Sequence, residues 1–407
     1  MSTISDRLKE LGVKVGARDL SIPRKSEPTS LDDLLGGQEY PTHYGATYLV
    51  EKYYSSYINQ NQTAFQLNHS LASIGAWAND ERIEGLSPDK IAFLDTETTG
   101  LSGGTGTYAF LIGVGRIEKD RFHLAQFFMR DPNEEAAQMA ALEAFLGPCR
   151  GLVTFNGKTF DLPLLNSRFI SQGWVSPFKE LSHIDLLHLA RRLWRARLAS
   201  CTLTSLEYNI LGAIRTMEDV PGWMIPQLYF DYLRSGDAQP LTNVFYHNAM
   251  DVISMAALLS HISKILSDPL NAPVSSPIDK VSMAKHYEDL GDWELSANLY
   301  ARSLEDELPE DLLLDALVRL ALLFKRQGDY LDALPLWERA AKLKCIPAFI
   351  ELAKYYEHQQ RDYQTAMEWT ESAINIANEA GDQSYEGQFW MLELKHRLNR
   401  LQRKNNE

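Results

Sequence analysis

The sequence is poor in cysteine, which excludes several classes of small or secreted protein. Only Cys149, Cys201 and Cys345 occur among 407 residues, and no two of them form a Cys-x-x-C pair. An odd, scattered set predicts reduced thiols and no disulfide framework. The first 20 residues carry charges throughout and lack the apolar segment of a signal peptide. We therefore expect a cytoplasmic protein.

Long apolar runs and an excess of positive charge are also absent. The longest apolar run, residues 252–259, includes Ser254 and is far shorter than the ~18 residues that a membrane span needs, so no membrane partner is expected. The net charge of -14 argues against a protein that coats nucleic acid through its overall field. Residues 90–262 hold 15 Lys and Arg against 17 Asp and Glu, which leaves room for a local basic groove.

The length and the 45% content of hydrophobic residues predict two or three domains with substantial cores. We expect residues 1–88 to be an irregular region that packs in part on the next domain. Residues 89–266 form the predicted α/β domain. Residues 267–277, with three prolines and no periodicity, are the predicted linker. Residues 278–407 are the predicted helical repeats.

The α/β domain begins with three predicted strands, residues 91–95, 108–117 and 122–128, which form an antiparallel meander. A helix over 134–146 and a buried strand over 151–155 follow. This order of elements is how RNase H-like domains begin, with a mixed sheet and flanking helices. Further helices are predicted over 159–172, 186–194, 203–211, 226–234 and 243–266.

Two acids, Asp95 and Glu97, end the first predicted strand. Alternate residues of a strand point to opposite faces, so these two side chains lie on the same side. Carboxylates held close together raise each other's pKa unless a cation lies between them. Mg²⁺ and Mn²⁺ accept oxygen ligands of this kind. The alternative is a strand that runs into a polar turn with two solvated acids.

A third acid, Asp161, lies in Asn156-Gly-Lys-Thr-Phe-Asp161, where a buried strand turns into a helix. The first turn of a helix favours an anion. The alternative is that Asp161 acts only as the N-terminal cap of that helix. Asp185 is the main rival acid, and we expect it to support the structure instead of the chemistry.

A fourth acid, Asp251, lies four residues after His247 on a predicted long helix, so both face the same side while Tyr246 is turned away. This choice of His247 depends on the helix beginning before it. The alternative is an exposed helix pair with no role in chemistry.

Together the three motifs resemble those of the DEDD superfamily of 3′–5′ exonucleases. The resemblance implies two-metal hydrolysis with Mg²⁺ or Mn²⁺: Asp95, Glu97 and Asp251 would hold one ion, and Asp95 with Asp161 the second. It implies that His247 is the general base. Most members have either a Tyr with three residues between it and the last Asp, or a His with four residues between it and the last Asp. Here three residues lie between His247 and Asp251, and four lie between Tyr246 and Asp251.

A repeat follows the linker. The pairs Asp292-Trp293, Asp329-Tyr330 and Asp362-Tyr363 recur 37 and then 33 residues apart, each followed by small residues seven apart. This pattern resembles tetratricopeptide repeats of ~34 residues. Residues 386–401 are the predicted capping helix. The combination with the preceding domain is similar to the YprB-type family, and we expect a protein partner at the repeats.

Basic residues near the acids are expected to contact the phosphate backbone of a single strand. Arginine with an aromatic residue suits a groove that follows the backbone and stacks on bases. The alternative is a solvated helix face. The candidates are Lys158, Arg191, Arg192, Arg195, Arg197 and Trp194.

The sequence therefore favours a metal-dependent 3′–5′ exonuclease that acts on single-stranded DNA or RNA. The alternative is a catalytically weak RNase H-like protein that acts as a scaffold through its repeats.

Overall fold

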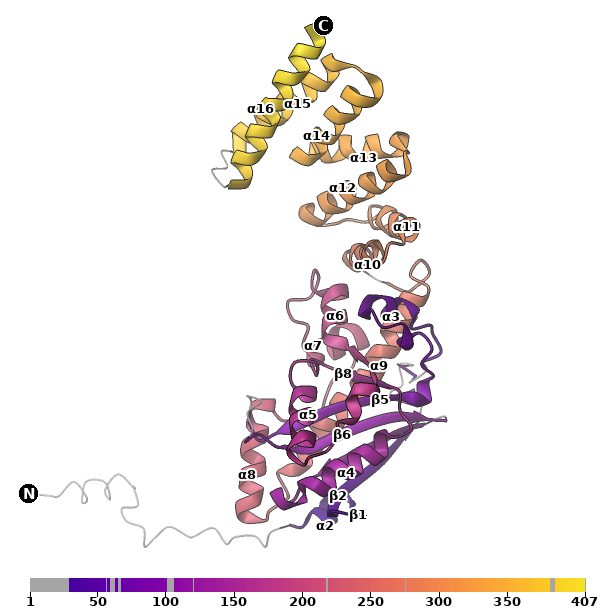
Figure 1. Ribbon diagram of the computed structural model, residues 1–407, viewed down its shortest axis with the longest axis vertical. Coiled ribbons are helices and arrows are strands. Elements are labelled where there is room, and N and C mark those ends of the chain that lie inside the picture. The colour runs from indigo at the N-terminus through magenta and orange to yellow at the C-terminus, as the bar shows by residue number, and fades with distance from the viewer. Residues whose placement is uncertain are drawn as a thin grey trace, which may run out of the picture.

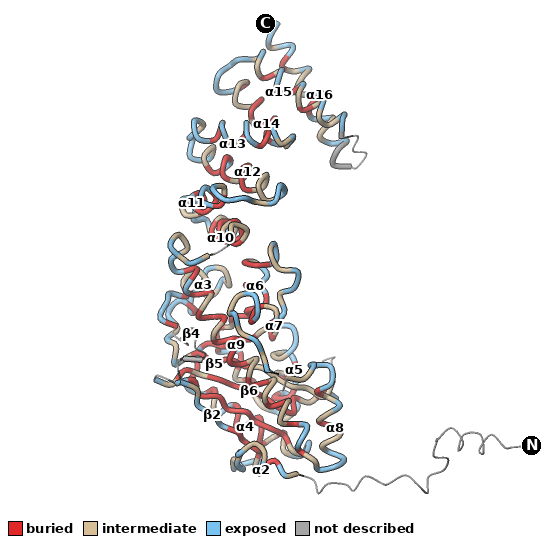
Figure 2. Tube along the Cα trace, turned by 180° about the vertical axis from the view of Figure 1, so that it is seen from behind, coloured by how far each residue is buried: buried red, intermediate tan, exposed pale blue. Residues whose placement is uncertain are grey.

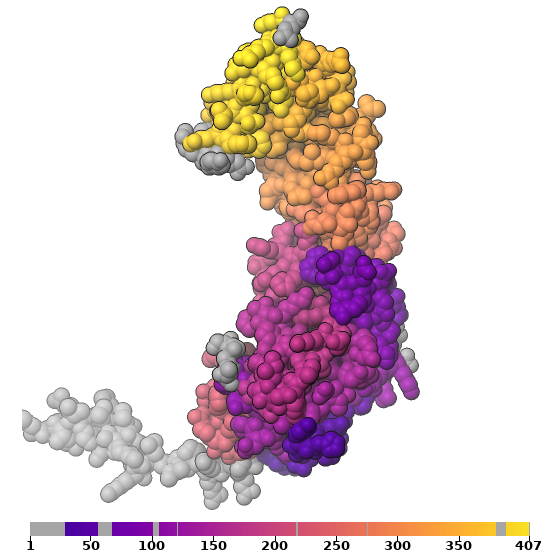
Figure 3. Space-filling model, viewed as in Figure 1, coloured from indigo at the N-terminus to yellow at the C-terminus, as the bar shows by residue number. Residues whose placement is uncertain are grey.

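The computed structural model describes residues 29–55, 57–58, 63–64, 67–100, 106–119, 121–216, 219–274, 276–380 and 385–406. A domain with a twisted sheet and helices on both faces occupies one end of an elongated molecule, and a column of helices extends from it (Figure 1). The space-filling view shows the same elongated shape, with a concave outline between the helical column and the sheet domain (Figure 3).

The main sheet has seven strands in the order β1-β2-β7-β6-β5-β8-β9. The expected meander is confirmed, because β5, β6 and β7 pair antiparallel, and β8 and β9 then continue the sheet in parallel with β5. This mixed sheet with flanking helices fits an RNase H-like fold. The strands are β1 (Gln38–Thr42), β2 (Gly45–Ser55), β5 (Ile91–Thr98), β6 (Ala109–Glu118), β7 (Arg121–Phe128), β8 (Gly151–Thr154) and β9 (Ser182–Asp185).

The N-terminal region is more ordered than the sequence predicts. Instead of an irregular segment, β1 and β2 extend the sheet, and β2 pairs with β7 along its length. Pro41 and Gly45 hide the pattern, and Pro41 is tolerated because β1 is an edge strand. A helix α2 (Leu31–Leu35) precedes them, and β3 (Tyr57–Ile58), β4 (Thr63–Ala64) and α3 (Ala72–Ala78) follow. The expectation for residues 1–28 lies outside the described residues.

Two helices, α4 (Glu135–Leu146) and α5 (Asp161–Ser171), cover one face of the sheet. The other face is covered by α9 (Leu241–Ser267), with α6 (Leu186–Trp194), α7 (Leu203–Leu206) and α8 (Ile225–Ser235) around it. Strand β5 alternates between the two cores: Ala92 and Leu94 pack with α4 and α5, and Ile91 and Phe93 pack with α9. The same alternation carries Asp95 and Glu97 to the α9 face.

Helix α9 is the central helix of this domain. Among the described helices it alone is long and apolar enough, by length and composition, to cross a membrane. However, 72% of its most apolar stretch is buried inside the protein, as the burial view shows (Figure 2). Its apolar character therefore reflects packing on the sheet and on the surrounding helices.

The C-terminal part is helical and is built of antiparallel helix pairs. The repeated aspartates cap the second helix of each pair: Asp292, Asp329 and Asp362 accept from backbone N–H groups three residues ahead. The small residues seven apart are fully buried where the helices meet. The helices are α10 (Pro277–Leu290), α11 (Trp293–Ser303), α12 (Glu310–Gln327), α13 (Tyr330–Lys342), α14 (Ile346–Tyr355), α15 (Tyr363–Ala380) and α16 (Tyr385–Asn406), and the small residues are Ser296, Ser303, Ala333, Ala340, Ala366 and Ala373.

The third repeat differs at its turn, where Arg361 adopts a φ of 54° in place of the glycines Gly291 and Gly328. A non-glycine residue is uncommon in this region, and the turn lacks the glycine that marks the other two repeats in the sequence. The assignment to the tetratricopeptide class stays a prediction. Residues 268–276 join α9 to α10.

The first repeat helix packs directly on the sheet domain. Arg197 Nε, just after α6, donates to Asp279 of α10 at 2.8 Å, and Arg192 pairs with Asp289. His286 Nε2 lies 2.9 Å from the Ser73 hydroxyl at α3. One hydrophobic cluster also runs from α6 and α9 into α10, so the two parts of the chain share an interface that is both polar and apolar.

Candidate active site

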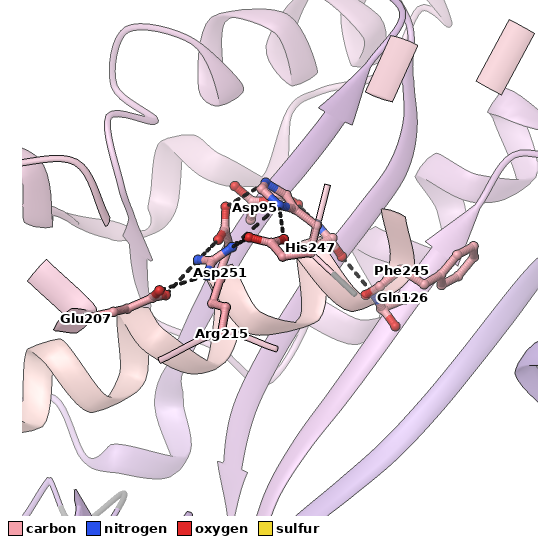
Figure 4. Close-up of polar contacts among 9 residues, drawn as sticks. Asp95, Gln126, Glu207, Arg215, Phe245, His247 and Asp251 are labelled. Carbon is pink, nitrogen blue, oxygen red and sulfur yellow. Dashed lines mark hydrogen bonds and ion pairs between the residues drawn. The ribbon is translucent and has the colours of Figure 1, made fainter. Parts of the chain in front are cut away.

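Asp95 of β5 is held in place by a chain of amide hydrogen bonds. Asn248 of α9 donates through Nδ2 to Asp95 Oδ2 at 2.9 Å, and Gln126 of β7 donates through Nε2 to Asn248 Oδ1 at 2.9 Å. Gln126 also donates to the carbonyl of Phe245, as Figure 4 shows. Sequence reasoning missed Asn248 and Gln126. Their signal was a polar residue in the middle of an apolar run.

Asp161 lies in the first turn of α5, as the sequence predicts, although the helix begins at Asp161 and not at residue 159. Its Oδ1 accepts from the Thr96 hydroxyl at 2.5 Å. Burial raises the pKa of Asp161 to about 6, and the nearby charge of Asp185 acts in the same direction. Asp185 is 1% exposed and accepts from the backbone N–H groups of Asn156, Lys158 and Leu187 at 2.8, 3.0 and 3.1 Å. Asp185 therefore holds the turn that delivers Asp161.

His247 and Asp251 both lie within α9, which begins at Leu241, so they share one face of the helix. His247 Nε2 is 3.7 Å from Asp251 Oδ2. The Tyr246 hydroxyl instead accepts from the backbone N–H of Thr216 at 3.1 Å. Of these two candidate bases, His247 is the one whose side chain lies beside Asp251.

Three further charged residues, Arg215, Glu207 and Asp219, surround Asp251 and His247, and sequence reasoning missed all of them. Glu207 Oε1 and Oε2 accept from Arg215 Nη2 and Nε at 2.6 and 2.7 Å, and Arg215 Nη2 also donates to Asp251 (Figure 4). The sequence did hold a signal for two of them, because Glu207 and Arg215 lie eight residues apart in a largely apolar segment.

Asp219 completes the cluster from the other side of the imidazole. Its Oδ1 lies 2.7 Å from His247 Nδ1, so an N–H on that nitrogen is held by the carboxylate. The other ring nitrogen, Nε2, then faces Asp251. A histidine oriented by a carboxylate in this way can act as a base through its free nitrogen.

The acids of the site repel one another in a partly buried setting. Burial raises the pKa of Asp95 well above its usual range, and the charges of Asp251 and Asp161 add to this. Burial and the charge of Asp95 likewise raise the pKa of Glu97. Burial also raises the pKa of Asp251, although Arg215 opposes that change. A set of carboxylates that repel one another in this way is stabilised by protons or by a cation.

The carboxylate oxygens and their mutual repulsion fit hard divalent cations such as Mg²⁺ and Mn²⁺. Among the residues that the structure describes, no three His, Cys, Asp or Glu side chains already stand together as a complete set of ligands for one ion. The donor chemistry of the four acids fits a divalent metal.

The predicted nucleic-acid contacts are only partly available. Trp194 is 2% exposed and packs near His261, so the expectation that it stacks on bases is wrong. Its place on the inner face of α6 made it a core residue. Arg192 and Arg197 are engaged by the acids of α10 described above. Lys158, Arg191 and Arg195 are exposed, and their contact with nucleic acid stays a prediction.

Residues 92–263 match the family model of the RNase H superfamily, which agrees with the mixed sheet and its acidic face. The sheet domain is therefore an RNase H superfamily domain. The chain is 36% identical over 305 residues to the "Uncharacterized protein YprB" of Bacillus subtilis (strain 168), a match that covers 72% of this chain and 71% of that protein. The chain thus belongs to the same family as YprB.

A solved structure that matches in part is the family B DNA polymerase from the hyperthermophilic archaeon Pyrobaculum calidifontis. The two chains are 13% identical, with a TM-score of 0.35. The match covers 59% of this chain and spans only 29% of the length of the polymerase.

Proposed function

We propose that the protein is a metal-dependent 3′–5′ exonuclease that hydrolyses phosphodiester bonds of single-stranded DNA or RNA. The observation that carries this proposal is the convergence of four acids from β5, α5 and α9 on one end of an RNase H superfamily domain. The raised pKa values of these four acids indicate that their negative charge is unfavourable at this site unless protons or a cation neutralise it. Location in the cytoplasm belongs to the same proposal and is supported by three free cysteines.

Asp95, Glu97, Asp161 and Asp251 would hold Mg²⁺ or Mn²⁺, in a two-ion arrangement. Bound ions of this kind supply an activated water and stabilise the negative charge that develops on the leaving oxygen. His247 takes the proton of the attacking water through Nε2, and Asp219 holds Nδ1 so that the ring keeps this orientation. Asn248 fixes the carboxylate of Asp95.

The direct test is digestion of 3′-labelled and 5′-labelled DNA and RNA oligonucleotides with Mn²⁺. Stepwise loss of nucleotides from the 3′ end is expected from the natural protein and is lost in Asp95→Ala. Asp89→Ala, which changes an exposed acid near the start of β5, is the matched control. Equal turnover by the natural protein and Asp95→Ala would place the activity elsewhere. The ratio of DNA to RNA turnover identifies the substrate class.

A second candidate function is a scaffold with weak or no catalysis, whose repeats bind a protein partner. The ion pair between Arg215 and Asp251 favours it, since this pair neutralises one of the four acids without a metal. The large exposed apolar residues Trp293 and Leu331 of the repeats suit protein contact. No turnover of any oligonucleotide with Mg²⁺ or Mn²⁺ would favour this function over the nuclease.

A further inference from the structure

Arg215 is a buried cation with a fixed anchor. Its side chain is 8% exposed, and that of Glu207 is 2% exposed. Two parallel hydrogen bonds join them, the fork geometry that orders arginine most strongly. Because Glu207 already supplies a full negative charge, Arg215 does not need Asp251 in order to remain buried.

The contact between Arg215 and Asp251 makes the acidic site asymmetric. Among the described residues, the side chains of Asp95 and Asp161 accept hydrogen bonds only from neutral groups, which include the amide of Asn248 and the hydroxyl of Thr96. The side chain of Glu97 makes no hydrogen bond to any residue that the structure describes. Asp251 alone of the four is paired with a guanidinium. A hard cation therefore meets the guanidinium in direct contact at Asp251, whereas the charge of Arg215 acts on Asp95 and Glu97 without a hydrogen bond.

We propose that the two metal positions are unequal: the one on Asp95 and Asp161 is open, whereas Arg215 competes with the ion at the one on Asp95, Glu97 and Asp251. This inference rests on the metal-dependent site proposed above. Entry of the ion at the second position breaks the contact of Arg215 with Asp251, while the paired bonds to Glu207 keep the guanidinium in place. Arg215 thereby sets the concentration of metal at which the second position fills.

The test is titration of the full-length protein with Mn²⁺ alone, without nucleic acid, followed by calorimetry and by the paramagnetic resonance signal of free Mn²⁺. The natural protein is expected to bind two ions in unequal steps. The double variant Glu207→Gln with Arg215→Gln removes the competing charge without leaving Glu207 unpaired. It is expected to tighten the weaker step about tenfold, the effect of removing one charge-assisted hydrogen bond, and to leave the stronger step within about twofold.

A second buried pair provides the matched control. Arg168 and Glu135 are joined by similar paired bonds, and Arg168 lies at the far end of α5 from Asp161. The double variant Glu135→Gln with Arg168→Gln therefore carries a similar loss of stability without touching Asp251, and both steps of Mn²⁺ binding are expected to stay unchanged. Arg215→Lys keeps the charge but loses the fork, and is expected to tighten the weaker step by less than the double variant at Glu207 and Arg215.

The outcomes separate this inference from the proposed function. If the natural protein and the variants at Arg215 bind Mn²⁺ alike, or the variants bind more weakly, the competition is overturned and the metal site stands. If neither the natural protein nor any variant binds Mn²⁺, both the metal site and the competition are overturned. If Arg215→Lys tightens the weaker step while the double variant does not fold, the competition is supported.

Discussion

Asn248 of α9 and Asp95 of β5 are joined by a hydrogen bond of 2.9 Å, which ties the central helix to the strand that carries the first acids. The helix can approach this closely because the residue opposite Asp95 on β6 is Gly113. A Cβ atom built on Gly113 would lie 2.2 Å from Asn248 Oδ1. Because Gly113 has no side chain, α9 can lie close to the strands that carry and adjoin the acids.

Gly113→Ala is expected to lower the free energy of unfolding by about 1–3 kcal/mol, because Asn248 has to move away from its two partners. The same displacement frees the carboxylate of Asp95 and is expected to weaken Mn²⁺ binding. Urea unfolding and Mn²⁺ titration measure the two effects. Gly85→Ala, at a glycine with open space around its Cβ position, is the control and should change neither.

Asp95→Asn is expected to raise the melting temperature of the protein in EDTA and to abolish the rise that Mn²⁺ produces. The substitution removes a carboxyl group whose pKa is raised by burial and by the charges of Asp251 and Asp161. The metal-free fold therefore gains stability, while a metal ligand is lost. Differential scanning calorimetry with and without Mn²⁺ tests this. A lower melting temperature in EDTA would contradict the repulsion that we infer.

The stability of the metal-free protein is expected to depend on the protonation of Asp161. Its pKa is raised from 3.8 to about 6, so the stability that protonation contributes is present below about pH 4 and is lost as the pH rises through about 6. Buried His183, His261 and His286, whose pKa values are lowered to about 4, act in the opposite direction as the pH rises. Comparison with Asp161→Asn cancels the contribution of these histidines.

Urea unfolding in EDTA between pH 5 and pH 8 measures this difference. Relative to Asp161→Asn, the natural protein should lose stability by about 1 to 1.5 kcal/mol across that range, the value of roughly the one pKa unit between pH 5 and the raised pKa of about 6. Saturating Mn²⁺ should reduce or reverse the loss. A difference that stays constant with pH would show that Asp161 does not titrate between pH 5 and pH 8.

Asp219→Asn is expected to lower kcat of the nuclease by about tenfold or more with little change in KM, because the carboxylate orients His247 and does not bind the substrate. Tyr246→Phe is the matched control at the neighbouring position. It loses only the hydrogen bond with Thr216 and should retain kcat within about twofold. Equal losses in the two variants would point to a general effect on the 212–220 segment.

The exposed arginines Arg191 and Arg195 are expected to contact phosphates. Replacement of both by Gln should weaken binding of a single-stranded oligonucleotide and reduce the slope of log affinity against log salt by about 0.7 for each phosphate that is no longer neutralised. Trp194→Phe should lower stability, because Trp194 is buried, and leave that slope unchanged. Fluorescence anisotropy at several salt concentrations, with Asp95 replaced by Asn to prevent cleavage, gives both values.

Local periodicity was sufficient to predict the meander, helix α4, and the position of Asp95 and Glu97 on one side of β5. These features depend on the alternation of a strand and the 3.6-residue turn of a helix, which act within a few residues. The repeated aspartates of the C-terminal part are equally local, because each caps the helix that follows it. Strands β1 and β2 were missed because β2 is stabilised by β7, which lies far away in the sequence.

The sequence by itself therefore determined the kinds of element and the four acids that the elements carry, since both are written in short-range patterns. Only the tertiary structure decided which charges meet. Arg215 and Asp219 reach this site from a segment in which no element is predicted, and the predicted helix that carries Glu207 gives no sign of its partner. Trp194 is removed from the surface by packing against α9. Burial makes these encounters strong, because a charge withdrawn from water must be matched by another group, and the identity of that group depends on the whole fold.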